Sequence, residues 1–228
     1  MGDQVRGNKI VNHYGTPRRP PRVVLLTAAD PLSAADLRTA TDPRTAARLG
    51  LDKEHRAISR AIDAAGAGDR LTVRTSLALR YGDLRRELLR NPAVVHFSGH
   101  GTRSGAIVLA GEDGHPQSVP PRILGDLFRI ANSRGTLRCV VLNACWSQAQ
   151  AFEIARHVPC VVGMSGRLPD GDAIRYAEAF YETVAAGRDV ACGHDMGVNA
   201  LDLDGGDVRL PVLMQQRPGV AGRTLVVD

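Results

Sequence analysis

Two stretches of this chain share one construction, an apolar run that ends in a reactive side chain. The first reads Val94-Val-His-Phe-Ser-Gly-His-Gly101, and the second reads Cys139-Val-Val-Leu-Asn-Ala-Cys-Trp146. Such runs are typical of strands buried on both faces of a parallel sheet. In these sheets chemistry collects beyond the carboxyl ends of the strands. If the two strands are neighbours, His100 and Cys145 meet at one edge of the sheet.

The rest of the chain alternates between predicted strands and predicted helices. We expect strands over 22–27, 70–76, 94–101, 137–142 and 159–164, and short late strands over 208–214 and 223–227. We expect helices over 52–65, 83–89, 121–131, 147–157, 172–186 and 190–203, and a hairpin over the site from 105–110 and 115–119. This alternation predicts an α/β three-layer sandwich, with a mainly parallel central sheet and helices on both faces.

Length and composition fit one domain. Of the 228 residues 43% are hydrophobic and 23% are charged, which are globular values. Residues 1–21 are rich in Gly, Pro and Arg and lack periodicity, so we expect a flexible arm before a single domain over 22–228. No apolar run is long enough for a membrane span or a secretory signal, so we expect a cytoplasmic protein that contacts no membrane.

The net charge of +5 raises the question of a nucleic-acid partner. The arginines are scattered, the compact basic cluster is Arg18-Arg19-Pro-Pro-Arg22, and no reading motif is present. We therefore expect no nucleic-acid partner.

The four cysteines predict neither a disulfide framework nor a metal site. None forms a Cys-x-x-Cys pair, and Cys139 and Cys160 lie inside apolar runs where a thiol is buried and inert. Cys192-Gly-His194 resembles one pair of ligands of a metal site, but the sequence has no second pair of Cys or His residues at the required spacing from it. We expect no metal and no cofactor.

Cys145 and His100 together predict nucleophilic chemistry. A thiol becomes a strong nucleophile when an imidazole takes its proton, and the backbone N–H groups of Gly101 and Cys145 are candidates for an oxyanion hole. A cysteine after an apolar run is more often a core residue, but Asn143 and Trp146 bracket this one where a core would be aliphatic. His96 points to the same strand face as His100, and its apolar setting favours a structural, hydrogen-bonded role.

At this point a family resemblance can be stated. His96-Phe-Ser-Gly-His100-Gly followed by Val141-Leu-Asn-Ala-Cys145 resembles the CHAT family of caspase-like cysteine peptidases, which is related to separase and more distantly to caspases, gingipains and legumain. Further similar landmarks are Val119-Pro-Pro, Val158-Pro-Cys-Val-Val-Gly-Met-Ser-Gly, Ala179-Phe-Tyr and Gly187-Arg. The resemblance implies a caspase-hemoglobinase fold and peptide-bond hydrolysis, with His100 as the base and Cys145 as the nucleophile.

The resemblance to the separase side of this clan also implies cleavage after a basic residue held by an acidic group. Asp170 in Leu168-Pro-Asp170-Gly-Asp172 matches the usual aspartate position best, and Asp172 is second. Either aspartate could instead cap the following helix. Asp30 would face the site edge in this fold as a substrate-binding residue, or simply form an Asp-Pro turn. Arg167 would partly neutralise an acidic pocket, or would serve acidic substrates.

The leading hypothesis is therefore a cysteine endopeptidase acting on a protein or peptide. It would be an effector of a bacterial defence or signalling system, with a sensor or regulatory protein as a separate partner unless the chain is part of a longer protein. The alternative is a catalytically silent CHAT-like protein-interaction module. A flavodoxin-like nucleotide binder is disfavoured, because Gly99-His-Gly-Thr is no phosphate loop and no Lys follows it.

Overall fold

A computed structural model of the chain describes residues 20–30 and 50–227. The predicted arm over 1–21 falls almost wholly outside these residues, as does the loop that follows Asp30.

A six-stranded sheet forms the centre of the molecule. Its strands are β1 (Arg22–Ala29), β2 (Leu71–Ser76), β3 (Val94–Gly99), β6 (Cys139–Asn143), β7 (Cys160–Met164) and β8 (Pro211–Gln215). They lie in the order β2-β1-β3-β6-β7-β8, and each pair is parallel except β7 with β8. Every residue of β3, β6 and β7 is buried, as their apolar runs predicted. The mainly parallel sheet is confirmed.

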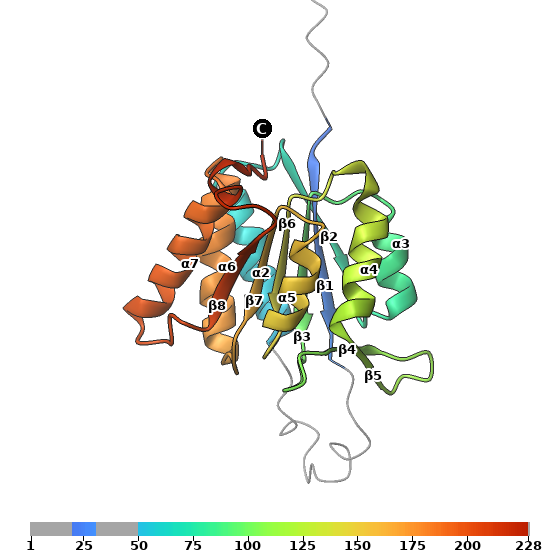
Figure 1. The fold of residues 1–228 in the computed structure, drawn as a ribbon. Helices are drawn as coiled ribbons and strands as arrows, with labels where there is room; N and C mark the ends of the chain where they lie inside the picture. Colours follow the sequence, from blue (N-terminus) through green and yellow to red (C-terminus); the bar gives the residue numbers. More distant parts are fainter. Residues whose placement is uncertain (1–19, 31–49, 228) are drawn as a thin grey trace, which may run out of the picture.

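Helices cover both faces of this sheet (Figure 1). One face carries α2 (Leu51–Ala64), α6 (Asp170–Ala185) and α7 (Val190–Leu203), and the other carries α3 (Tyr81–Leu88), α4 (Pro121–Ala131) and α5 (Gln148–Ala155). Side chains of the strands alternate between two cores, so Val94 packs on the α2 and α6 side while Val95 packs on the α4 and α5 side. This alternation decides which helices each strand residue can reach.

The expected hairpin is present at the carboxyl edge of the sheet. It consists of β4 (Ile107–Ala110) and β5 (Pro116–Val119), which pair antiparallel. The second late strand is not present: the prediction over 223–227 is wrong. A short 3₁₀ turn, Ala221–Arg223, and one isolated bridge from Asp189 to Leu225 stand there. Val226 and Val227 are apolar because they pack into the core under α2 and α6, not because they pair.

Helix α6 begins two residues earlier than predicted. Pro169 is extended, and its carbonyl accepts a bond from Ala173 N at 2.9 Å, so the helix starts at Asp170. Proline lacks an N–H and fits just outside or at a helix start. Both aspartates of the predicted pocket therefore lie inside the first turn.

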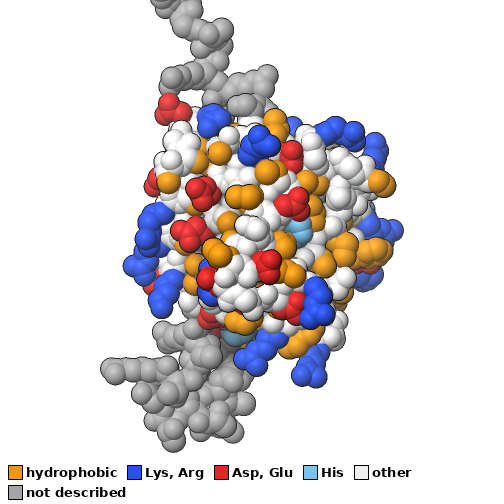
Figure 2. Space-filling view, turned by 90° about the vertical axis from the view of Figure 1, so that its left-hand side faces the viewer, with side chains coloured by type: hydrophobic (Ala, Val, Ile, Leu, Met, Phe, Trp, Pro, Cys, Tyr) orange, Lys and Arg blue, Asp and Glu red, His pale blue; other side chains and the backbone are white. Residues whose placement is uncertain are grey.

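The face of the molecule on the α7 side carries charges of both signs (Figure 2). On the side that carries α7, acidic and basic side chains are interspersed with apolar ones (Figure 2). In the described part of the chain no helix is long and apolar enough to cross a bilayer.

Candidate active site

The end of β3 is held by the hairpin. β3 ends at Gly99, and His100 is the next residue. Val108 N donates to the backbone oxygen of His100 at 2.9 Å, and Gly101 bridges to Ile107. The backbone that carries the imidazole of His100 is therefore held by β4.

The end of β6 turns sharply into α5. The Ser147 hydroxyl donates to Leu142 O and accepts from Met164 N, both at 2.9 Å. Trp146 N donates to Gly166 O at 3.0 Å. These bonds tie the turn to β6 and to the end of β7, which fixes Cys145 at the strand tip.

His100 and Cys145 come together because β3 and β6 are neighbours. Ser98 pairs with Asn143 in the register of these strands, and His100 and Cys145 each stand two residues further on. A Cβ placed on Gly101 would lie 1.8 Å from Cys145 O, so only glycine allows this approach. The two residues thus stand at adjacent strand ends and line one cavity, and the contact between imidazole and thiol stays a prediction.

The amides of Gly101 and Cys145 are the donors predicted for an oxyanion hole. In residues 20–30 and 50–227, neither amide donates to a backbone carbonyl. Cys145 N would lie 3.3 Å from a Cβ on Gly101, so the two amides belong to one patch of backbone. Their role as oxyanion-hole donors stays a prediction.

Asp30, at the end of β1, contacts the imidazole. Its Oδ1 lies 2.7 Å from His100 Nε2, and the side chains of His100 and Asp30 are 42% and 17% exposed. Asp30 does not line the cavity that contains Cys145. The structure thus places Asp30 at the site edge, as expected, as a partner of the histidine and outside the cavity that Cys145 lines.

A cavity of about 400 Å³ opens in front of the thiol. It lies on the α2 and α6 side of the sheet, where Ala173 and Ile174 form one wall. Its polar and reactive lining residues are Glu54, Ser98, His100, Asn143, Cys145, Arg167 and Asp170.

Glu54, in α2, is a cavity-lining carboxylate that sequence reasoning missed. Its carboxylate is buried at the cavity and lies 2.9 Å from His96 Nε2, and it accepts a hydrogen bond from Asn143 Nδ2. His96 is thus buried and hydrogen-bonded, which confirms its structural role. A signal was present: Glu54 stands on the apolar stripe of α2 with Ile58 and Ala61, where a lone charge is out of place.

The pKa of Glu54 is set by competing causes. Burial raises the pKa, but the imidazole of His96 and the hydrogen bonds from His96, Ser98 and Asn143 lower it by more, so the pKa lies below its ordinary 4.5. The group is ionised at neutral pH and contributes negative charge to the cavity floor.

The two candidate pocket aspartates are separated by the structure. Asp170 lines the cavity, and its Oδ2 accepts from Gly50 N at 3.1 Å. Asp172 does not line it and faces Arg175, with 3.7 Å between Oδ1 and Nη2. Arg167 lines the same cavity as Asp170, as the sequence suggested.

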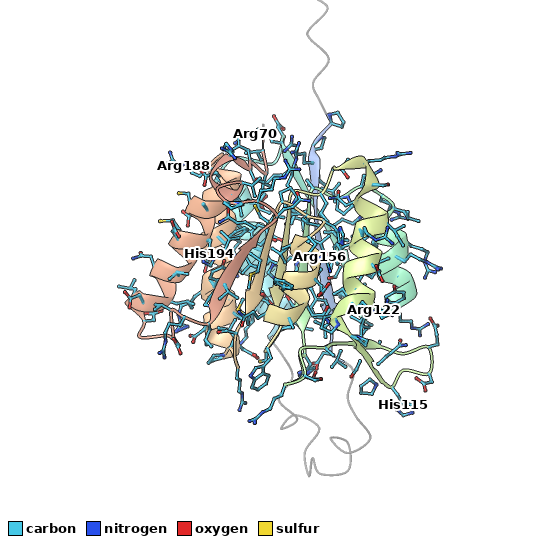
Figure 3. The ribbon with its side chains drawn as sticks, viewed as in Figure 1. Arg70, His115, Arg122, Arg156, Arg188 and His194 are labelled. Atoms are coloured by element: carbon cyan, nitrogen blue, oxygen red, sulfur yellow. The ribbon has the colours of Figure 1, made fainter. Side chains whose placement is uncertain are left out.

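Cys139 and Cys160 lie in the core and do not line the cavity. Cys139 and Cys160 are fully buried, and burial raises the pKa of both thiols, that of Cys160 to about 11. His194 Nδ1 lies 2.8 Å from the Tyr176 hydroxyl, in the helical layer that carries α7 (Figure 3). The described residues contain no cluster of three or more His, Cys, Asp or Glu side chains that could hold a metal.

Comparison with known proteins identifies the family of this chain. The model of the CHAT domain matches residues 14–193. The chain belongs to the CHAT domain family of caspase-like peptidases. The His100 and Cys145 motifs lie inside the matched range.

Relatives of this CHAT domain are distant. A "Roc-COR-CHAT protease" from an unknown prokaryotic organism is 23% identical over 114 residues, which are 48% of this chain and 11% of that protein. The chain thus spans about a tenth of the length of this curated relative.

Two solved structures share the fold. Caspase-1 from Spodoptera frugiperda has a TM-score of 0.55 at 10% identity, over 95% of this chain and 94% of that one. The Arg-specific cysteine proteinase gingipain R has the same TM-score and identity, over 89% of this chain and 48% of that one. The predicted caspase-like fold is confirmed.

Proposed function

We propose that this CHAT domain is a cysteine endopeptidase in which Cys145 is the nucleophile and His100 the general base. The observation that carries the proposal is the placement of the two residues, on neighbouring strand tips and on the wall of one cavity. The imidazole takes the thiol proton, and the thiolate attacks the scissile carbonyl. The amides of Gly101 and Cys145 stabilise the oxyanion, and His100 returns the proton to the leaving amine. Water then hydrolyses the thioester.

Asp30 acts as the positioning residue for this base. Its carboxylate accepts the hydrogen bond of His100 Nε2. Nδ1 is then the nitrogen left for the thiol, because the tautomer and the ring orientation are fixed by the bond to the carboxylate.

We further propose that the cavity takes a basic side chain on the amino-terminal side of the cut bond. Two carboxylates, Glu54 and Asp170, line it against one guanidinium, that of Arg167. A guanidinium pairs with a carboxylate through two parallel bonds that an ammonium cannot reproduce, so Arg is preferred to Lys. Of the two aspartates considered, Asp170 is the pocket acid.

A peptide library tests this function, with Asp172 as the control for Asp170. The wild-type chain is expected to cleave after Arg, and Asp170→Ala is expected to lower kcat/KM on Arg peptides roughly 10- to 100-fold, the value of a charge-assisted hydrogen bond. Asp172→Ala removes an acid from the same helical turn outside the cavity and is expected to leave the cleavage profile unchanged. Cleavage after acidic or apolar residues would contradict the basic pocket and point to Arg167.

The protein context is also a proposal. We infer that the domain acts on protein substrates as an effector under the control of a regulatory protein or module. The curated relative supports this inference, because its name joins Roc, COR and CHAT in one protein. A role in bacterial defence and a cytoplasmic location stay predictions of the sequence.

A further inference from the structure

A second cavity lies on the other side of Cys145. Its volume is about 490 Å³, and its lining includes Pro121, Trp146, Phe152 and Met214 as apolar residues. Phe152 belongs to α5 and Pro121 to α4, so this cavity is on the opposite face of the sheet from the one that contains Glu54. Cys145 lines the first cavity, and the next residue, Trp146, lines the second.

The aromatic side chains of this second cavity are not core residues. Trp146 is half-buried with a φ of +52°, a conformation that bulky residues rarely adopt. Backbone strain of this kind gathers at functional sites. The Arg103 guanidinium lies 5.5 Å from the centroid of the indole, and Phe152 is 60% exposed. Exposed aromatic area next to a nucleophile indicates a binding surface.

A peptide bound at the dyad must use both sides of Cys145. This step rests on the proposed function, in which the residue before the cut fills the cavity with Glu54 and Asp170. The amide donors of Gly101 and Cys145 fix the scissile carbonyl, so the chain beyond the cut leaves past Trp146. The second cavity then receives the leaving half of the substrate.

We propose that the Trp146 cavity is the subsite for the residue that follows the cut bond and that it selects an apolar side chain. Its lining is mixed, because polar residues stand beside the apolar ones, among them Arg103, Ser104, Gln148 and Ser165. The apolar part favours burial of such a side chain. Glu153, the acid of its lining, is engaged by Arg156 at 3.2 Å and offers little to a cationic residue.

Internally quenched peptides with a constant half ending in Arg, followed by Phe, Leu, Ser or Lys, test the subsite. Wild type is expected to cleave the Phe and Leu peptides with a kcat/KM about tenfold above the Ser peptide. Phe152→Ser and Trp146→Ala are expected to abolish this preference, mainly through the KM of the Phe and Leu peptides. Ile130→Ser is the matched control, because Ile130 is also 60% exposed but lies outside the cavity. It is expected to keep the preference.

A binding measurement covers the case in which the Trp146 variant fails to fold. Trp146 is the single tryptophan, so its fluorescence in Cys145→Ala reports on this cavity. The Phe peptide is expected to change the emission at concentrations where the Ser peptide does not. Equal cleavage of all four peptides, or a preference kept in Phe152→Ser, would overturn the subsite while leaving the peptidase intact. Failure of the peptidase itself would show as no cleavage of any peptide, with Cys145 alkylated no faster than Cys192.

Discussion

Two histidines of the same strand segment have the same kind of partner but differ in exposure. His96 Nε2 lies 2.9 Å from Glu54, and His100 Nε2 lies 2.7 Å from Asp30. The side chain of His96 is 1% exposed, and that of His100 is 42% exposed. A histidine–carboxylate pair is therefore not by itself a sign of catalysis. The first imidazole is buried beneath the cavity, whereas the second is exposed at the strand tip, where the proposed dyad needs it.

The sharpest test of this contrast removes the exposed histidine. His100→Ala and Cys145→Ala are each expected to lower turnover of an Arg peptide by at least about 10³-fold, because the dyad acts as a unit. Their free energy of unfolding is expected to stay within about 0.5 kcal/mol of wild type, since both residues are partly exposed. Cys192→Ser, at another half-buried thiol, is the control and should keep full activity. Wild-type turnover in either dyad variant would remove the assignment.

Removing the buried carboxylate of Glu54 is expected to lower the stability of the fold strongly. Glu54→Ala leaves His96 and Asn143 without their partner and is expected to lower the free energy of unfolding by about 3–5 kcal/mol. Asp52→Ala, in the same helix but 69% exposed, should cost less than about 0.5 kcal/mol. Denaturant titrations measure both, and equal effects would show that the Glu54 pair is not structural.

The pH dependence of that stability follows from the lowered pKa of Glu54. A carboxyl group whose pKa is lower in the folded than in the unfolded chain stabilises the fold fully above the unfolded value of 4.5. This stabilisation is lost as the pH falls below 4.5 through the folded pKa. The difference in unfolding free energy between wild type and Glu54→Gln is therefore expected to be constant from pH 7 to about 5 and to shrink at lower pH. A difference that grows on acidification would contradict the sign of the shift.

Replacing Asp30, the partner of the exposed histidine, is expected to lower activity less than removing His100. Asp30→Asn keeps the size of the side chain but removes its charge, and it is expected to lower kcat on the order of 100-fold, the cost of a misplaced catalytic group. KM should change less than about twofold, because Asp30 lies outside the substrate cavity. A rise in KM with kcat unchanged would return Asp30 to the substrate-binding role that the sequence suggested.

The smallest effect is expected from replacing Cys139, whose buried side chain only packs in the core. Cys139→Ala should retain activity and cost on the order of 1 kcal/mol of stability. Peptide turnover and a denaturant titration measure the two. Loss of turnover in a stable variant would show that burial does not separate the two kinds of cysteine.

Much of the frame could be predicted from the sequence. The apolar runs at β3, β6 and β7 predicted the central strands of the sheet, because an apolar strand is stable only when both of its faces are buried. The reactive residues at the ends of β3 and β6 followed from the point where each apolar run stops. The late strand failed because Val226 and Val227 are as apolar as strand residues, and sequence alone does not separate packing from pairing.

The partners of the two histidines could not be predicted in the same way. Glu54 is 42 residues from His96, and Asp30 is 70 residues from His100. Only the strand order and the alternation of side chains across the sheet bring them together. Asp170 and Asp172 differ for a local reason: two steps along a helix turn a side chain by about 200°, so one faces the cavity and the other turns away. A helix start predicted at 172 hid this difference.

Alkylation of the native chain by iodoacetamide, followed at each cysteine by mass spectrometry, tests the dyad most directly. At pH 7 Cys145 is expected to react at least about tenfold faster than the half-buried Cys192, with Cys139 and Cys160 protected. In His100→Ala the rates at Cys145 and Cys192 should fall within about twofold of each other. A Cys145 that reacts no faster than Cys192 in the wild-type chain, or as fast without His100 as with it, would contradict the account.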